Sequence, residues 1–206
     1  MMKAAVVGAS GVEIREVPKP TPGPTQVLVS VRASGLNRAD LIMASGRAHG
    51  AHGGAGAILG LEFAGEVVET GSQVTGIKVG DRVMCSGNAG YAEYAVTDYG
   101  RVAKIPANNM TYTQAATLPI ALQTMHNALV TAGRLKKGES VLIQGASSGV
   151  GIMGMQIAKF MGAALVIGSS TNEGRRACLK EFGADLAIDT KDPGWADAVV
   201  KATDGK

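Results

Sequence analysis

The first half of the chain carries short runs in which hydrophobic and polar residues alternate, separated by clusters of Gly, Pro and Ser. Alternation with a period of two is typical of a strand with one buried face. A succession of such strands and turns predicts a small all-β barrel. The expected strands cover residues 3–7, 12–17, 26–33, 61–70, 80–84 and 92–97.

Three segments interrupt this alternation. The prolines between residues 18 and 24 predict an extended connection, because a proline ring is incompatible with a helix interior. Residues 37–44 are expected to form one or two helical turns, with Asp40 near their start. The segment 49–56 is so rich in Gly and Ala that it predicts a loop.

A helical stripe of Ala, Leu and Met runs through residues 113–132. This spacing predicts a helix with one buried face. Thr113 is the expected N-cap, and Pro119 is expected to kink or split the helix. We place the domain boundary just before this helix, which predicts one domain over residues 1–110 and a second over residues 111–206.

Strands and helices alternate over the rest of the chain. This order predicts two right-handed βαβ units, which form one mononucleotide-binding half of a doubly wound parallel sheet. No second half follows, so the apolar strand at 140–144 would be an edge strand open to pairing with another chain, and we expect a homodimer. The expected elements are strands 140–144, 164–168 and 185–188 and helices 150–162, 173–182 and 194–203.

A glycine-rich turn follows the strand at 140–144, with the spacing Gly-x-x-x-Gly-x-Gly rather than the usual G-x-G-x-x-G. A strand, a glycine turn and a helix together place unpaired backbone N–H groups where a pyrophosphate can bind. Glycine is needed where a Cβ would hold the phosphate away from the backbone. An ordinary strand-to-helix turn is the alternative, but the second buried strand that follows favours a dinucleotide site. The candidate residues are Gly145, Ser148, Gly149, Val150 and Gly151.

The end of the next strand indicates which nicotinamide is bound. Many NAD sites place an Asp or Glu there, whereas this chain has Ser169 and Ser170, followed by Arg175 and Arg176. Hydroxyl and guanidinium groups suit a 2′-phosphate, so we expect NADPH. Glu173 argues for NADH, although a carboxylate in the first helical turn also interacts with the helix dipole. The alternative for both arginines is a solvated helix face.

Composition excludes several classes of protein. The net charge of +3 is spread along the 206 residues without a Lys/Arg run, and only 4% of the residues are aromatic, so we expect no nucleic-acid partner. Cys85 and Cys178 are too few for a disulfide framework or a Cys-rich zinc site. Because no apolar run approaches the ~20 residues of a membrane span and no signal peptide is evident, we expect a cytoplasmic protein.

Motifs spread along the chain carry a family resemblance. They are Val17-Pro18-Lys19-Pro20-Thr21-Pro22-Gly23-Pro24, Gly35-Leu36-Asn37-Arg38-Ala39-Asp40, Gly60-Leu61-Glu62-Phe63-Ala64-Gly65, Val79-Gly80-Asp81-Arg82-Val83, Leu118-Pro119, Thr124 and Gly145–Gly151. With these motifs the chain resembles the quinone oxidoreductase branch of the medium-chain dehydrogenase/reductase superfamily. The resemblance implies a GroES-like β-barrel catalytic domain, then a Rossmann domain, with the cofactor in the cleft between them. The chain looks like a C-terminally truncated member.

The resemblance also concerns metal binding. In zinc alcohol dehydrogenases of this superfamily, a Cys and a Gly-His-Glu segment supply metal ligands. Asn37 and Gly60-Leu61-Glu62 stand at those positions here, and the Cys-rich zinc loop is missing. One carboxylate does not hold Zn²⁺, which takes three or four protein ligands. The resemblance therefore implies a metal-free reductase, in which Glu62 is a solvated or hydrogen-bonded strand residue.

The resemblance assigns roles to three further residues. Thr124 would contact the nicotinamide carboxamide, Asn37 would line the substrate face, and Asp40 would order that turn. The alternatives are a helix-facing hydroxyl for Thr124 and an Asx-type turn for the other two. Some relatives carry a Tyr and an Arg shortly after the Asn, but this chain has Ile42 and Ala44, so that Tyr proton donor is absent. The proton sources left open are Arg47, His49, His52 and solvent.

These observations lead to one expected function and two alternatives. The expected function is NADPH-dependent transfer of hydride to a quinone or another activated enone, without zinc. The first alternative is a catalytically inactive nucleotide-binding fragment, stable only as a dimer or with a partner. The second is a 2-enoyl thioester reductase.

Overall fold

The computed structural model describes residues 1–49, 52–107 and 109–205, and the side chains of residues 48, 49 and 52 lie outside that description. The chain divides into two compact units, Met1–Ile120 and Ala121–Lys206. The division lies later than the 110/111 boundary expected from the sequence. The reason is that α2 (Tyr112–Ala115) packs against strands β3 (Gln26–Ser34) and β6 (Glu62–Thr70) of the first unit.

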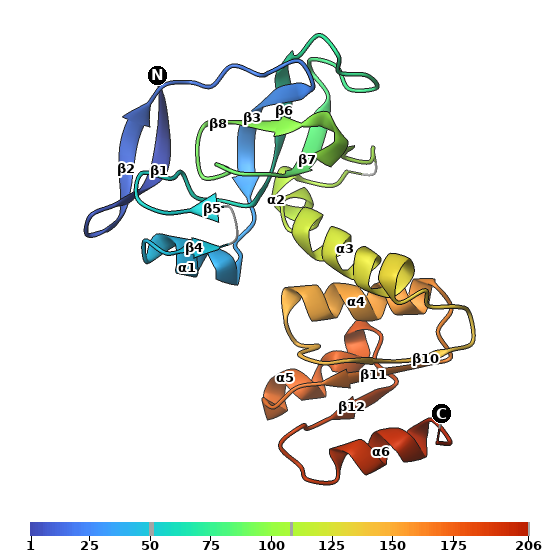
Figure 1. Cartoon of the computed structure of the whole chain (residues 1–206). Helices are drawn as coiled ribbons and strands as arrows, with labels where there is room; N and C mark the ends of the chain where they lie inside the picture. The colour runs from blue at the N-terminus through green and yellow to red at the C-terminus, as the bar shows by residue number, and fades with distance from the viewer. Residues whose placement is uncertain (50–51, 108, 206) are drawn as a thin grey trace. The chain divides into compact units, whose positions relative to one another are not determined.

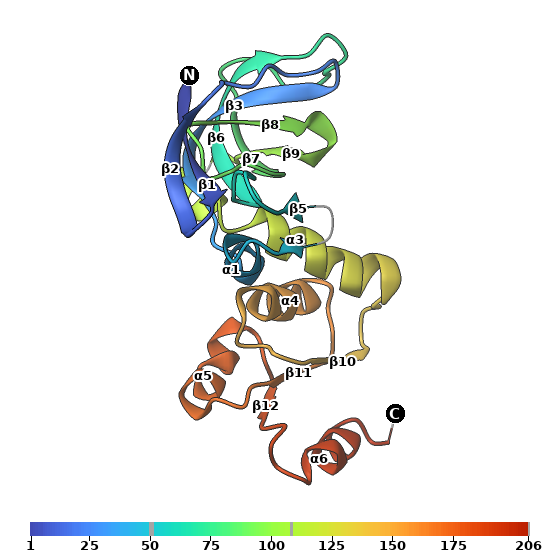
Figure 2. The same ribbon diagram turned by 60° about the vertical axis from the view of Figure 1, so that its left-hand side comes forward.

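Five antiparallel strands in the first unit form one curled sheet with the order β8-β3-β6-β7-β9, which confirms the predicted all-β half (Figures 1 and 2). Register shifts between β3 and β6 add to the bend of the strands. The remaining strands are β7 (Arg82–Ser86), β8 (Tyr94–Asp98) and β9 (Val102–Lys104), of which β9 was not predicted. The buried core residues of this sheet are Val27, Val29, Phe63, Val67, Val83, Cys85 and Ala95.

The predicted N-terminal hairpin is present as β1 (Met2–Gly8) and β2 (Gly11–Val17). The short helix is present as α1 (Arg38–Ala44). The predicted loop at 49–56 is partly wrong, because β4 (Ala48–His49) and β5 (His52–Gly53) pair as a two-residue ribbon. Residues 50 and 51 between them lie outside the described part of the chain.

The single helix predicted over 113–132 is three elements: α2, α3 (Pro119–His126) and a π-helical segment, η2 (Asn127–Ala132). Thr113 is not the N-cap. Thr111 is, because its hydroxyl accepts from the Gln114 N–H at 3.2 Å and the Gln114 side chain accepts from the Thr111 N–H at 2.9 Å. This capping box is written in the sequence as Thr-x-x-Gln. Pro119 begins α3 rather than kinking a longer helix, a position that suits its missing N–H.

The second unit contains the predicted parallel sheet, with the order β10-β11-β12. Helix α4 (Gly149–Phe160) packs on β10 (Ser140–Ile143) and β11 (Leu165–Ser169), as Figures 1 and 2 show. The helix predicted over 173–182 is α5 (Glu173–Ala177) followed by a 3₁₀ turn, η3 (Leu179–Phe182). The remaining elements are β12 (Leu186–Ile188) and α6 (Trp195–Ala202). No helix in the described ranges is both long and apolar enough to cross a bilayer.

Asp185 makes the stability of the second unit depend on pH. Burial raises the pKa of Asp185, but the Lys159 ammonium and the Val166 N–H, which donate to its carboxylate, lower the pKa by more, so that it lies below the ordinary value of 3.8. A carboxyl with a depressed pKa in the folded state stabilises the fold above its unfolded pKa, and this contribution is lost as the pH falls through the folded pKa.

We therefore expect the thermal midpoint of the second unit to fall below pH about 4. In the Asp185→Asn variant this fall should be shallower, and the exposed-site variant Glu181→Gln should follow the unsubstituted protein. The fluorescence of Trp195, the single tryptophan of the chain, reports this unit. Identical pH profiles for Asp185→Asn and the unsubstituted protein would contradict the assignment.

Candidate functional site

The turn between β10 and α4 is held by two serines from different segments. Gly145 has a φ of +63°, a left-handed conformation that favours glycine. Its N–H donates to the Ser169 hydroxyl at 3.3 Å, and the Ala146 N–H donates to the Ser169 carbonyl at 2.8 Å. Ser148 is the N-cap of α4, because its hydroxyl accepts from the Gly151 N–H at 3.0 Å. The turn is therefore fixed before any ligand binds.

The first two amides of α4 remain open. Gly149 and Val150 stand in the first helical turn, where backbone N–H groups have no intrahelical acceptor, and neither has another acceptor among the described residues. A Cβ placed on Gly149 would meet no heavy atom within 4 Å. A Cβ on Gly151 would lie 2.6 Å from both Ala146 Cα and the Gly145 carbonyl oxygen. Gly149 therefore borders open space, and Gly151 is the position at which the helix packs against the turn.

A hollow of about 480 Å³ runs along the free edge of β10 to the start of α4. Its lining includes Val141–Gln144 of the strand, together with Ser148 and Val150. Among the described strands, β10 pairs only with β11, so its other edge is unpaired. The open amides therefore lie at the end of this hollow. Pairing of β10 with a second chain stays a prediction.

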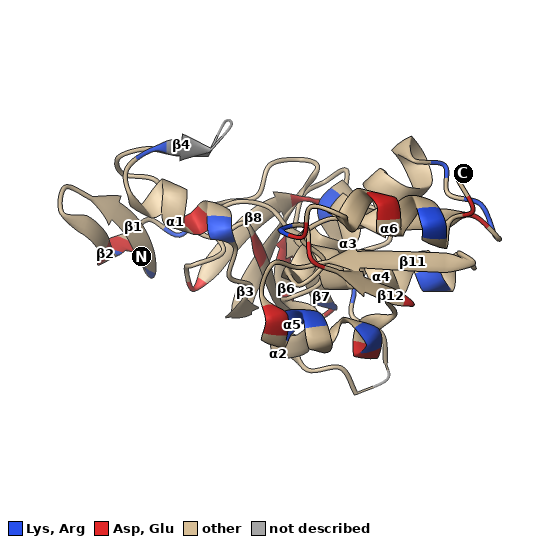
Figure 3. Ribbon diagram, turned by 90° about the horizontal axis from the view of Figure 1, so that it is seen from below, with Lys and Arg blue, Asp and Glu red and all other residues tan. Residues whose placement is uncertain are grey.

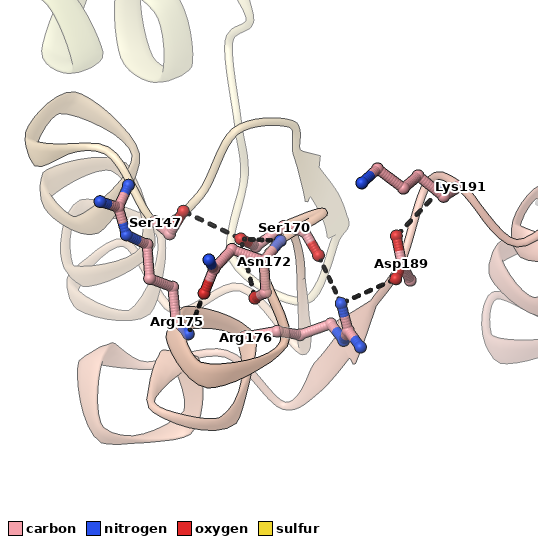
Figure 4. Close-up of polar contacts among 7 residues, drawn as sticks. All are labelled: Ser147, Ser170, Asn172, Arg175, Arg176, Asp189 and Lys191. Carbon is pink, nitrogen blue, oxygen red and sulfur yellow. Dashed lines mark hydrogen bonds and ion pairs between the residues drawn. The ribbon is translucent and has the colours of Figure 1, made fainter.

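The two serines at the end of β11 have different surroundings. Ser169 is buried and both its hydroxyl and its carbonyl bond to the β10–α4 turn, so it supports that turn from below. The Ser170 hydroxyl lies 3.0 Å from the Ser147 hydroxyl (Figure 4). Ser147 was missed by sequence reasoning, although it stands inside the glycine-rich turn. The pair of hydroxyls connects the β10–α4 turn to the end of β11.

Arg175 and Arg176 diverge from neighbouring positions of α5. Figure 4 shows the Arg175 side chain extending to the side of Ser147, whereas Arg176 points away, toward Asp189. Arg176 Nη1 donates to the Ser170 carbonyl at 2.8 Å and to Asp189 Oδ2 at 2.9 Å. The Arg175 side chain is exposed. In Figure 3, α5 carries basic and acidic residues together, which agrees with Glu173 at its start.

Asn37, Asp40 and Glu62 form one connected group in the first unit. The Asn37 N–H donates to Asp40 Oδ2 at 2.7 Å, and Asn37 Nδ2 donates to Glu62 Oε1 at 2.8 Å. Glu62 Oε2 accepts from the Ile120 N–H at 2.9 Å, at the start of α3. Glu62 is only 4% exposed, so the expected hydrogen-bonded role is confirmed and the solvated one is wrong. Asn37 is thus held from both its backbone and its side chain.

Tyr91 completes this group and was missed by sequence reasoning. Its hydroxyl donates to Asp40 Oδ2 at 2.7 Å, from a position 51 residues away in the chain. Burial and the bond to the Asp40 carboxylate raise the pKa of Tyr91, so the phenol keeps its proton. Asp40 Oδ1 is buried without a partner among the described residues. A mostly apolar hollow of about 440 Å³ borders Asn37, Asp40 and Tyr91.

The other candidates are less constrained. Thr124 lies on α3, in the second unit, and its side chain is exposed. Arg47 is exposed, and the side chains of His49 and His52 lie outside the described part of the structure. Burial raises the pKa of Cys85 to about 12, which removes this thiol as a nucleophile. No cluster of three or more His, Cys, Asp or Glu side chains suited to a metal ion occurs among the described residues, and metal-free chemistry stays a prediction.

Two known families match most of this architecture. Residues 23–107 match the Alcohol dehydrogenase GroES-like domain, and residues 149–206 match the Zinc-binding dehydrogenase family. The quinone oxidoreductase-like protein 2 homolog of Nematostella vectensis is 35% identical over 89% of this chain and 50% of its own length. For the 2-methylene-furan-3-one reductase of Solanum lycopersicum the identity is 34% over 80% and 44%. The phenolphthiocerol/phthiocerol polyketide synthase of Mycobacterium tuberculosis has a polypeptide that is 34% identical over 93% of this chain and 9% of its own length.

Solved structures agree with these matches. A quinone oxidoreductase of Pseudomonas syringae pv. Tomato DC3000 superposes with a TM-score of 0.85 at 33% identity, over 100% of this chain and 64% of that one. A mycobacterial protein complexed with NADPH gives a TM-score of 0.82 at 29% identity, over 98% and 63%. The chain therefore spans less than two thirds of the length of these proteins.

Proposed function

Because the chain belongs to the medium-chain dehydrogenase/reductase superfamily, we propose that it is an NADPH-dependent oxidoreductase that reduces quinones or other activated enones without zinc. One observation carries this proposal: two open amides at the start of a twelve-residue helix face empty space, beside an exposed arginine. A helix N-terminus of this kind favours a phosphate group.

The residues present fit a dinucleotide. The amides of Gly149 and Val150 would hold the diphosphate, since a Cβ on Gly149 would occupy the space above them. Arg175 and the Ser170 hydroxyl would hold the 2′-phosphate, because an exposed guanidinium can bind it in a bidentate manner. Thr124 would contact the carboxamide of the nicotinamide. When bound, the reduced nicotinamide supplies the hydride.

Asn37 is the residue that would orient the substrate. Glu62 accepts one hydrogen of the Asn37 amide, so the second N–H and the carbonyl stay available to a ligand. Asp40 and Tyr91 hold the turn that carries Asn37, which reduces the freedom lost when a substrate binds. The names of two relatives support the substrate class, since one is a quinone oxidoreductase-like protein and the other a reductase of a methylene-furanone, which is a conjugated enone.

The test is NADPH oxidation, followed at 340 nm, on addition of a small naphthoquinone to the whole chain. Turnover that depends on both the quinone and the protein supports the proposal. NADPH binding without turnover, together with self-association on a sizing column, would favour the inactive nucleotide-binding fragment. The presence of highly reducing polyketide synthases among the relatives favours a second candidate, a 2-enoyl thioester reductase. Faster turnover of a crotonyl thioester than of the quinone would select it.

Replacing Arg175 by Gln tests the nucleotide preference. Since Arg175 is exposed and directed to the Ser147 side of the site, we expect the variant to bind NADPH about tenfold more weakly and NADH unchanged. The quenching of Trp195 or the enhancement of nucleotide fluorescence measures both affinities. The exposed Lys180→Gln variant controls for net charge. Equal weakening of NADPH and NADH, or equal effects of the two variants, would contradict the assignment.

A further inference from the structure

We propose that Asp189 sets the nucleotide preference of this site by withholding Arg176 from the cofactor. The inference rests on the proposed function, because it concerns the same dinucleotide site. Asp189 stands directly after β12, outside the glycine-rich turn and the strand end that the sequence singled out. Its carboxylate is the acidic group in contact with the guanidinium of Arg176.

The geometry of Arg176 shows how it is withheld. Nη1 carries two hydrogens, and both have acceptors: the Ser170 carbonyl at 2.8 Å and Asp189 Oδ2 at 2.9 Å. The side chains of Arg176 and Asp189 are 23% and 29% exposed, so solvent screens their attraction only in part. Figure 4 shows that Arg176 is drawn to the side away from Ser147 and Arg175. Its charge is therefore spent inside the protein.

Asp189 is itself held in place. The Lys191 N–H donates to Asp189 Oδ1 at 3.0 Å, while Oδ2 meets Arg176, so both oxygens of the carboxylate have partners. The titratable and charged groups near this pair on the adjoining elements are Arg175 and Glu173 of α5 and Lys191 after β12. Arg175 is the member of the arginine pair that remains exposed. A 2′-phosphate therefore meets one available guanidinium and, close behind it, a fixed negative charge.

Two consequences follow for binding. Removing the charge of Asp189 should release Arg176 and should also remove a repulsion that acts on a phosphate but not on the ribose hydroxyl of NADH. Asp189→Asn should therefore raise the affinity for NADPH relative to NADH. The size of the change should be about three- to tenfold, the range of one solvent-accessible charge-assisted hydrogen bond.

The experiment is a fluorescence titration of NADPH and NADH into the whole chain and four variants: Asp189→Asn, Arg176→Gln, the double variant, and the exposed-charge control Glu181→Gln. We expect the NADPH-to-NADH affinity ratio to rise in Asp189→Asn only. Arg176→Gln should leave the ratio within about twofold, and the double variant should lose the gain. If Asp189→Asn does not fold, the unchanged ratio in Arg176→Gln still tests the proposal.

Three results would overturn this inference while leaving the proposed function intact: equal weakening of both nucleotides in Asp189→Asn, a gain that survives in the double variant, or a large loss of NADPH preference in Arg176→Gln. Failure of the unsubstituted protein to bind either nucleotide would overturn the proposed function, and this inference with it.

Discussion

Gly151→Ala should destabilise the second unit by about 3 kcal/mol and abolish NADPH binding. The new Cβ would lie 2.6 Å from Ala146 Cα and from the Gly145 carbonyl oxygen, and both are backbone atoms that cannot turn aside as a flexible side chain would. Either α4 moves away from the β10–α4 turn or the turn opens. In both cases the open amides of Gly149 and Val150 are displaced.

The matched control is Gly174→Ala, a second glycine-to-alanine change in a helix of the same unit. A Cβ at that position meets only Asn172 Oδ1, at 3.7 Å, which is an ordinary contact. It should stabilise the unit by about 0.5–1 kcal/mol, because alanine has the higher helix propensity. Chemical denaturation followed by Trp195 fluorescence gives both values. Equal stabilities for the two variants would show that the helix does not pack as closely as described.

Glu62→Gln should destabilise the first unit by about 1–3 kcal/mol and weaken substrate binding. Both carboxylate oxygens of Glu62 accept hydrogen bonds, from Asn37 Nδ2 and from the Ile120 N–H, at a site that is 4% exposed. A glutamine side chain has only one oxygen, so its amide group must face one of these donors. The buried donor left without an acceptor accounts for the cost.

The four tyrosines of the chain all lie in the first unit, so near-ultraviolet circular dichroism follows its unfolding separately from Trp195. Glu69→Gln is the control, since Glu69 is an exposed residue of the same strand and should change stability by less than about 0.5 kcal/mol. If Glu62→Gln unfolds together with Glu69→Gln, the carboxylate does not hold the turn that carries Asn37.

The parts of this structure that depend on local chemistry could be predicted from the sequence. The βαβ order, the N-terminal hairpin and the close-packing glycine of α4 follow from periodicity and turn residues. The N-cap was misplaced at Thr113, although the capping pair Thr111 and Gln114 is visible in the sequence. Short β9 lacked a run long enough to predict.

The contacts that join distant segments could not be predicted. Tyr91 meets Asp40 across 51 residues, and Arg176 meets Asp189 across 13, so neither pair has a local pattern. The two arginines of α5 read alike in sequence, and only the placement of Asp189 distinguishes them. The expected role for both of them in cofactor binding, and those of Asn37, Asp40 and Thr124, stay predictions.

Calorimetric titration of NADPH into the folded, unsubstituted chain tests the central claim most directly. The open amides at the start of α4 and the exposed Arg175 predict saturable heat with one site per chain, and weaker binding of NADH. No heat with either nucleotide, from protein shown to be folded by circular dichroism, would contradict the account.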